Sequence, residues 1–103
     1  MSPTIHYSLG GVDFEWDADK ALTNLTRHRV SFEAAASSLL DPDASVTDDE
    51  PHSAIEARWR CMGRSTFGVL VATAYTLRDQ RYRLISARPA TKRERHEYER
   101  SLR

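Results

Sequence analysis

The alternation of apolar and polar residues predicts a hairpin at the start of the chain. Val12, Phe14 and Trp16 fall on one side of an extended run, as expected for a strand with one buried face. Another short extended run, residues 5–9, precedes it. Gly10-Gly11 separates the two runs, and a two-residue glycine loop between strands is a hairpin signal.

Helical spacing predicts a helix after this hairpin, with Asp17 as its N-cap. The polar residues Lys20, Asn24 and His28 recur every four positions and predict one polar face. The predicted buried stripe consists of the apolar residues at the remaining helical spacing, namely Ala18, Ala21, Leu22 and Leu25.

A second predicted helix begins after Ser31, which can cap it, and ends before Asp41-Pro42. Its core positions are Phe32, Ala35, Ala36 and Leu39.

The second half of the chain reads mainly as strands. An acidic loop over residues 41–53 includes one short strand around residues 44–47, and three longer runs follow at residues 56–63, 69–76 and 81–87. Connections this short make neighbouring strands antiparallel.

A last helix begins at the capping box Thr91-x-x-Glu94 and offers only Tyr98 and Leu102 as an apolar side. The order of elements predicts an α+β fold: a curled antiparallel sheet of three to five strands, two N-terminal helices and a C-terminal helix.

Composition limits the class of protein. With 103 residues, the chain predicts a single domain over residues 1–103. The lone Cys61 excludes an intramolecular disulfide, and no His or Cys spacing suggests a metal site. The first residues do not resemble a signal peptide, and no apolar run is long enough to cross a bilayer. We therefore expect a cytoplasmic protein with no membrane partner and no cofactor.

The net charge of zero conceals two oppositely charged segments. Residues 41–56 contain six acidic and no basic side chains, whereas residues 78–103 contain nine basic and four acidic ones. This asymmetry is typical of proteins that bind nucleic acid or an acidic partner. The alternative is that the two segments meet within the fold.

A set of short motifs runs through the chain in a fixed order. The opening motifs are Phe14-Glu15-Trp16-Asp17, Lys20, Asn24, His28 and residues 30–35. The middle motifs are Asp41-Pro42, His52-Ser53, Glu56, Arg58 and Gly63-Arg64-Ser65. The closing motifs are residues 83–88, residues 90–95 and Tyr98. Together they cover about residues 12 to 100 and resemble the BrnT toxin family.

This resemblance implies a RelE-like ribonuclease toxin fold and an endoribonuclease that cuts RNA without a metal. It also implies neutralisation by a BrnA-like antitoxin with a ribbon-helix-helix DNA-binding element. Operator DNA would then be contacted only through the antitoxin. The toxin would form a homodimer, or a heterotetramer with the antitoxin. Residues 1–11 lie outside the resemblance, as an N-terminal extension or hairpin strand.

The chain departs from the family pattern at Arg29, where glycine is typical. Glycine after a helix often takes a positive φ, which costs a residue with a Cβ about 1 kcal/mol. Arg29 therefore predicts either a mildly strained turn or a turn of different shape.

Metal-free RNA cleavage needs a base, a cation for the transition-state charge and an acid. The residues that suit these roles are His52, Glu56, Arg58, Arg83 and Arg88. Glu56 and Arg58 share a face of the predicted strand, where a plain surface ion pair is the alternative. Arg88 after its strand could bind phosphate or only cap the sheet edge, and His52 could be a loop residue without a role.

Further basic residues are candidates for RNA binding, namely Lys20, His28, Arg64, Lys92 and Arg93. Solvated helix faces, or docking of the antitoxin on the last helix, would explain part of this set equally well.

Two function classes remain open: a ribonuclease toxin, and a non-catalytic module that binds nucleic acid or a partner. A toxin that has lost activity is a third reading.

Overall fold

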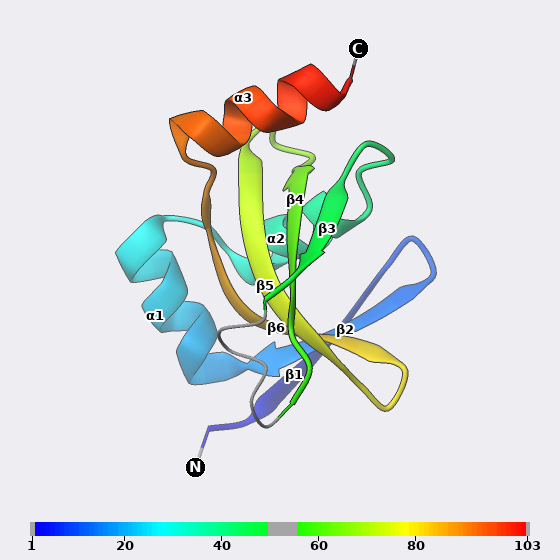
Figure 1. The fold of residues 1–103 in the computed structure, drawn as a ribbon. Helices are drawn as coiled ribbons and strands as arrows, with labels where there is room; N and C mark the ends of the chain where they lie inside the picture. Colours follow the sequence, from blue (N-terminus) through cyan, green and yellow to red (C-terminus); the bar gives the residue numbers. More distant parts are fainter. Residues whose placement is uncertain (1, 50–55, 103) are drawn as a thin grey trace.

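The computed structural model describes residues 2–49 and 56–102, and within these residues the chain forms six strands and three helices. The elements are β1 (Thr4–Leu9), β2 (Val12–Asp17), α1 (Ala18–His28), α2 (Phe32–Leu39), β3 (Ser45–Asp48), β4 (Trp59–Arg64), β5 (Leu70–Arg78), β6 (Arg81–Pro89) and α3 (Lys92–Ser101). The strands form one sheet in the order β1-β2-β6-β5-β4-β3 (Figure 1).

The sheet is larger than predicted and is mixed rather than antiparallel. β2 runs parallel to β6, with Phe14 beside Tyr82 and Glu15 beside Arg83, while the other neighbouring strands are antiparallel. Short connections reveal antiparallel neighbours, but nothing local in the sequence reveals that the N-terminal hairpin joins a strand near the C-terminus. The prediction of three to five antiparallel strands was therefore wrong in size and in one pairing.

The N-terminal hairpin itself is confirmed. Leu9 pairs with Val12 across the turn, and Gly10 and Gly11 have φ angles of 59° and 78°. A two-residue turn with both φ angles positive matches the twist of the flanking strands.

Aromatic and small apolar side chains fill the space between the sheet and α2. Phe32 of α2 meets Trp16 of β2 edge-on, with ring centroids 5.7 Å apart. Phe32, Ala35 and Ala36 are fully buried, as predicted, and Cys61 is a core residue. Gly63 allows β4 and α2 to lie close together, because a Cβ at this position would lie 2.1 Å from the Ser38 carbonyl oxygen of α2.

The buried stripe predicted for α1 is wrong at its two leucines, although the partly buried Ala21 does pack against the core. Leu22 and Leu25 are exposed, Ala18 and Ala21 are only partly buried, and the buried residue of α1 is Asn24. Asn24 Nδ2 donates to the Ala87 and Val30 carbonyls at 2.8 and 2.9 Å, and the Ala87 N–H donates to Asn24 Oδ1 at 3.0 Å.

The position of α1 explains this result. Within the described residues β2 pairs with β6 only at Tyr82 and Arg83. Further along β6, the backbone groups of Ala87 need other partners, and the carboxamide of Asn24 supplies both a donor and an acceptor. Polar complementarity, rather than burial of leucine, decides which side of α1 faces the sheet.

The turn after α1 resolves the question raised by Arg29. Arg29 adopts the left-handed conformation itself, with φ 58° and ψ 29°, and its N–H donates to the Leu25 carbonyl at 2.8 Å. The turn thus has the shape that suits glycine, and the chain accepts the strain of a side chain there.

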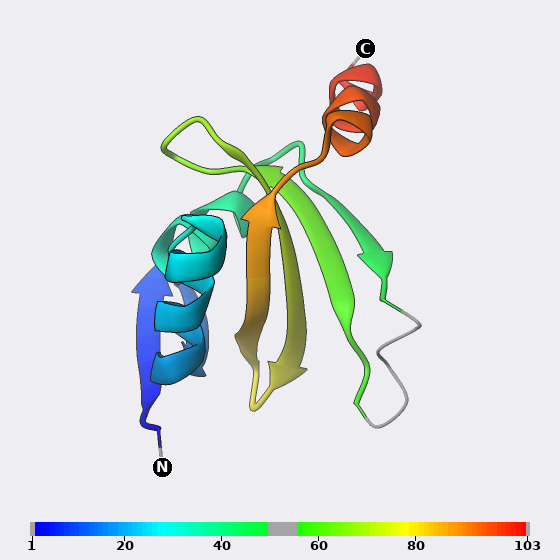
Figure 2. The ribbon, with the colours of Figure 1, turned by 90° about the vertical axis from the view of Figure 1, so that its left-hand side faces the viewer.

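α3 lies apart from α1 and α2, beyond the C-terminal end of β6 (Figures 1 and 2). The predicted capping box is present. Tyr98 is buried with Leu70, Ala90 and the partly buried Met62, whereas Leu102 is half exposed. Among the described residues, no helix is long and apolar enough to cross a membrane.

Candidate functional site

The sheet has one face packed on α2 and an opposite face that carries several charged side chains. We call this second side the open face. Along β6, Tyr82 and Leu84 point towards the core, so Arg81 and Arg83 point to the open face. A register shift between Ala74 and Tyr75 then keeps Arg88 on the same side as Arg83.

Two ion pairs lie near the β5–β6 turn. Arg83 Nη1 of β6 is 2.6 Å from Glu15 Oε2 of β2, and both side chains are largely buried. Arg78 Nη2 of β5 donates to both carboxylate oxygens of Glu56 at 3.1 Å, in a much more exposed setting.

Thr76 connects these pairs to the segment before β4. Its hydroxyl donates to the Ala57 carbonyl at 2.7 Å, and on its other side Thr76 is in register with Arg83. The segment that contains Glu56 and Arg58 therefore lies on one side of Thr76, and Arg83 of β6 lies on the other side. We call Glu15, Glu56, Arg58, Arg78 and Arg83 the turn-end cluster.

One premise of the sequence prediction is wrong here. β4 begins at Trp59, so Glu56 and Arg58 precede the strand and do not share a strand face. Glu56 pairs with Arg78, which sequence reasoning did not single out, rather than with Arg58. The strand begins at Trp59, which is in register with Tyr75 of β5 and stacks its ring on it, whereas Glu56 lies in a bend.

A further group of charges lies on the open face near α3. Arg88 forms a two-bond fork with Glu94, with Nη1–Oε1 at 2.7 Å and Nη2–Oε2 at 3.0 Å. Arg60 of β4 lies 3.7 Å from Asp49. We call Arg60, Arg88 and Glu94 the helix-end cluster. Because β6 continues to Pro89, Arg88 lies within the strand and not after it, which corrects the prediction.

The Arg88–Glu94 fork fixes the charge of Glu94. The hydrogen bond from Arg88 is the largest influence, and with the Thr91 backbone N–H it lowers the pKa of Glu94 to about 2 despite partial burial. The same carboxylate raises the pKa of Arg88. Glu94 thus holds Arg88 and caps α3, and it cannot donate a proton near neutral pH.

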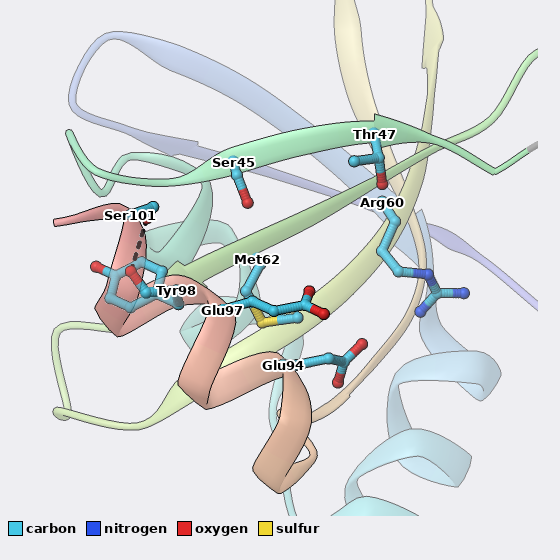
Figure 3. A pocket seen from close by; sticks show the side chains of 8 residues that line it. All are labelled: Ser45, Thr47, Arg60, Met62, Glu94, Glu97, Tyr98 and Ser101. Atoms are coloured by element: carbon cyan, nitrogen blue, oxygen red, sulfur yellow. Dashed lines mark hydrogen bonds between the residues drawn. The ribbon is translucent and has the colours of Figure 1, made fainter. Parts of the chain in front are cut away.

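A small hollow lies between β3, β4 and α3 beside the helix-end cluster (Figure 3). Its volume is about 160 Å³. Its lining is Ser45, Thr47, Arg60, Met62, Glu94, Glu97, Tyr98 and Ser101. Figure 3 shows Arg60 and Glu94 at one end of this hollow and Tyr98 and Ser101 at the other.

Asp41 ties α3 to the end of β4. Its Oδ2 accepts hydrogen bonds from the Tyr98 hydroxyl and from the Arg64 backbone N–H, the latter at 2.7 Å. Burial opposes ionisation of Asp41, but these bonds outweigh it and lower its pKa. The Arg64 guanidinium lies 5.5 Å from the centre of the Tyr98 ring. Arg64 is exposed beside the turn between β4 and β5.

The other predicted RNA-binding residues are dispersed. Lys20 and His28 stand one helical turn before and after Asn24, so they lie along the β6 edge. Lys92 and Arg93 are exposed on the first turn of α3, where Arg93 pairs with Glu97. His52 lies outside the described residues.

The acidic and basic segments of the sequence meet within the fold at the ion pair of Glu56 with Arg78. Asp49 of the acidic segment instead contacts Arg60, which lies outside the basic segment. In residues 2–49 and 56–102, no group of three His, Cys, Asp or Glu side chains is arranged as metal ligands would be.

Sequence reasoning missed Glu15 as part of the site. The only signal was its polar position between Phe14 and Trp16, and its partner Arg83 becomes apparent only from the parallel pairing of β2 with β6.

The fold is shared with a solved toxin structure. The crystal structure of the Brucella abortus ribonuclease toxin, BrnT, matches with a TM-score of 0.57 and 24% sequence identity. The match covers 75% of this chain and 94% of that one. No curated protein sequence matches the chain.

The class of protein follows from the sequence family that spans most of the fold. Residues 16–94 match the family described as "Ribonuclease toxin, BrnT, of type II toxin-antitoxin system". The chain belongs to the BrnT family of toxins.

Proposed function

We propose that the chain is a metal-independent endoribonuclease whose active site lies on the open face. Family membership supports the ribonuclease class. The observation that supports this location is the turn-end cluster, in which Thr76 holds the Glu56–Arg58 segment beside Arg83. The RelE-like character of the fold is part of this proposal.

The turn-end cluster suits the chemistry of RNA cleavage. A carboxylate at Glu56 takes the proton from the 2′-hydroxyl, and Arg58 and Arg83 stabilise the charge on the transition state. His52, four residues before Glu56, protonates the leaving oxygen. The nucleophile belongs to the RNA itself, so the reaction needs no metal-activated water.

The helix-end cluster extends the site along the RNA. Arg83 and Arg88 are five residues apart on β6, at most about 16 Å, so they contact different phosphates of one strand. Arg64, Lys92 and Arg93 continue the path past α3, and Lys20 and His28 flank it along the β6 edge.

A BrnA-like antitoxin with a ribbon-helix-helix element neutralises the toxin in this proposal. The antitoxin alone contacts operator DNA, and its symmetry brings two toxin copies into a heterotetramer.

The second candidate function is a non-catalytic binding module. Arg60, Arg83 and Arg88 each have an acidic partner, and such pairs also occur where arginine only maintains the fold.

An RNA cleavage assay in excess EDTA distinguishes the two. Glu56→Gln should reduce the cleavage rate at least about 100-fold. Arg95→Ala, an exposed arginine of α3 outside both clusters, is the matched control and should cleave normally. If the wild-type chain binds RNA with steep salt dependence but leaves it intact, the binding module is correct and the nuclease proposal fails.

A further inference from the structure

Four large apolar side chains are exposed on α1 and on the turn between β4 and β5. Leu22 and Leu25 of α1 are 65% and 46% exposed, and Phe67 and Val69 near the turn are 76% and 45% exposed. Single exposed apolar residues are ordinary, but a contiguous group marks an interaction surface.

A groove joins α1 to the β4–β5 turn. Its volume is about 220 Å³, and its lining includes Leu25, Arg29, Phe67, Val69 and Val71. Val71 belongs to the core cluster on the α2 side of the sheet, so the groove lies on the opposite side from the open face. We call it the α1–turn groove.

The leucines of α1 are exposed because of Asn24. Its three hydrogen bonds at the β6 edge turn that side of the helix inward, and Leu22 and Leu25 are carried outward. The fold therefore leaves unused an apolar stripe that would otherwise stabilise the core.

The charge around the groove is positive. Residues 57–78 and residues 20–30 contain no Asp or Glu, and Glu33 is the acidic residue of the short segment that starts α2. Arg29 lines the groove, and Arg27 stands in the last turn of α1. The complementary partner is apolar and acidic.

We propose that the α1–turn groove binds a segment of the protein antitoxin that presents apolar anchors flanked by Asp and Glu. This inference rests on the proposed function, since a type II system supplies the antitoxin. Apart from Arg29 and Phe67, the lining is aliphatic or small. This favours a protein over RNA, because single-stranded RNA is bound by several cationic groups and by rows of stacked aromatic rings.

Calorimetric titration with the purified protein encoded beside this chain tests the proposal. Leu25→Ser and Phe67→Ser should each weaken binding at least tenfold. Leu77→Ser is the matched control, because Leu77 is 51% exposed at the β5–β6 turn and outside the groove. Circular dichroism checks that all three variants fold, and RNA cleavage by each should equal that of the wild type.

The outcomes separate this inference from the proposed nuclease. Unchanged affinity of both groove variants for the neighbouring protein overturns the proposed binding site. Failure of the wild-type chain to bind that protein overturns it too. The RNA cleavage assay tests the nuclease proposal independently of both results. If the groove variants lose RNA binding but keep the antitoxin, the groove is an RNA surface. If the wild type is dimeric and the variants monomeric in light scattering, a second copy is the occupant. Both results contradict the proposal.

Discussion

The carboxamide of Asn24 pairs with the backbone of Ala87 as a neighbouring strand would, with one bond donated and one accepted. Both residues are buried. Asn24→Ala removes these bonds and leaves the Ala87 N–H and two carbonyl groups without partners. Because each unpaired buried group is costly, we expect a loss of about 2–3 kcal/mol in the free energy of unfolding.

Urea unfolding followed by circular dichroism measures this loss. Thr23→Ala, at the neighbouring exposed position of α1, is the control and should change the free energy by less than about 0.5 kcal/mol. Equal stability of the two variants would show that Asn24 does not hold α1 to the sheet.

Gly63 is predicted to tolerate no side chain. A Cβ there would lie 2.1 Å from the Ser38 carbonyl oxygen, a backbone atom that moves only with α2. Gly63→Ala should therefore destabilise the chain by about 3 kcal/mol. Gly68→Ala is the comparison, because space around it is open and only its φ of +82° resists a side chain; there we expect about 1 kcal/mol. Thermal unfolding of both variants ranks them, and the reverse order contradicts the packing at Gly63.

Local signals in the sequence predicted most of the secondary structure. The caps at Asp17, Ser31 and Thr91 were found because each side chain bonds to the backbone within three residues. The glycine hairpin was found for the same reason, since its turn chemistry is local.

What the sequence did not reveal depends on contacts between distant segments. The burial of Asn24 depends on a β6 edge more than sixty positions away, and the Glu15–Arg83 pair depends on the parallel register of β2 with β6. The pairing of Glu56 with Arg78 depends on where β4 begins. Residue type and spacing therefore predicted the arginines of the site but not their partners.

Arg29→Gly should stabilise the chain. Arg29 has a left-handed backbone at φ 58°, where a Cβ costs about 1 kcal/mol. Glycine removes that cost, so we expect a gain of up to about 1 kcal/mol in urea unfolding. Arg29→Ala keeps the Cβ and should give no gain. A stabilised alanine variant would instead assign the effect to loss of the arginine charge at the end of α1.

The Arg88–Glu94 fork should make the free energy of unfolding depend on pH in the acidic range. The pKa of Glu94 is about 2 in the folded chain, against 4.5 for an unperturbed carboxyl. A carboxyl group whose pKa is lowered by folding stabilises the fold at pH values above its pKa in the unfolded chain. This stabilisation is lost as the pH falls through its pKa in the folded chain. The stabilisation is thus complete above about pH 5 and disappears towards pH 2.

Glu94→Gln isolates this contribution. Above pH 5 the variant should be less stable than the wild type by about 1–2 kcal/mol, allowing for solvent screening of the partly exposed pair. The difference should shrink towards zero near pH 2 in urea titrations at successive pH values. Glu97→Gln is the control on the same helix, because Glu97 pairs with the exposed Arg93; its curve should run parallel to that of the wild type. A Glu94→Gln difference that is constant with pH would mean that Glu94 acts through its cap on Thr91 and not through its charge.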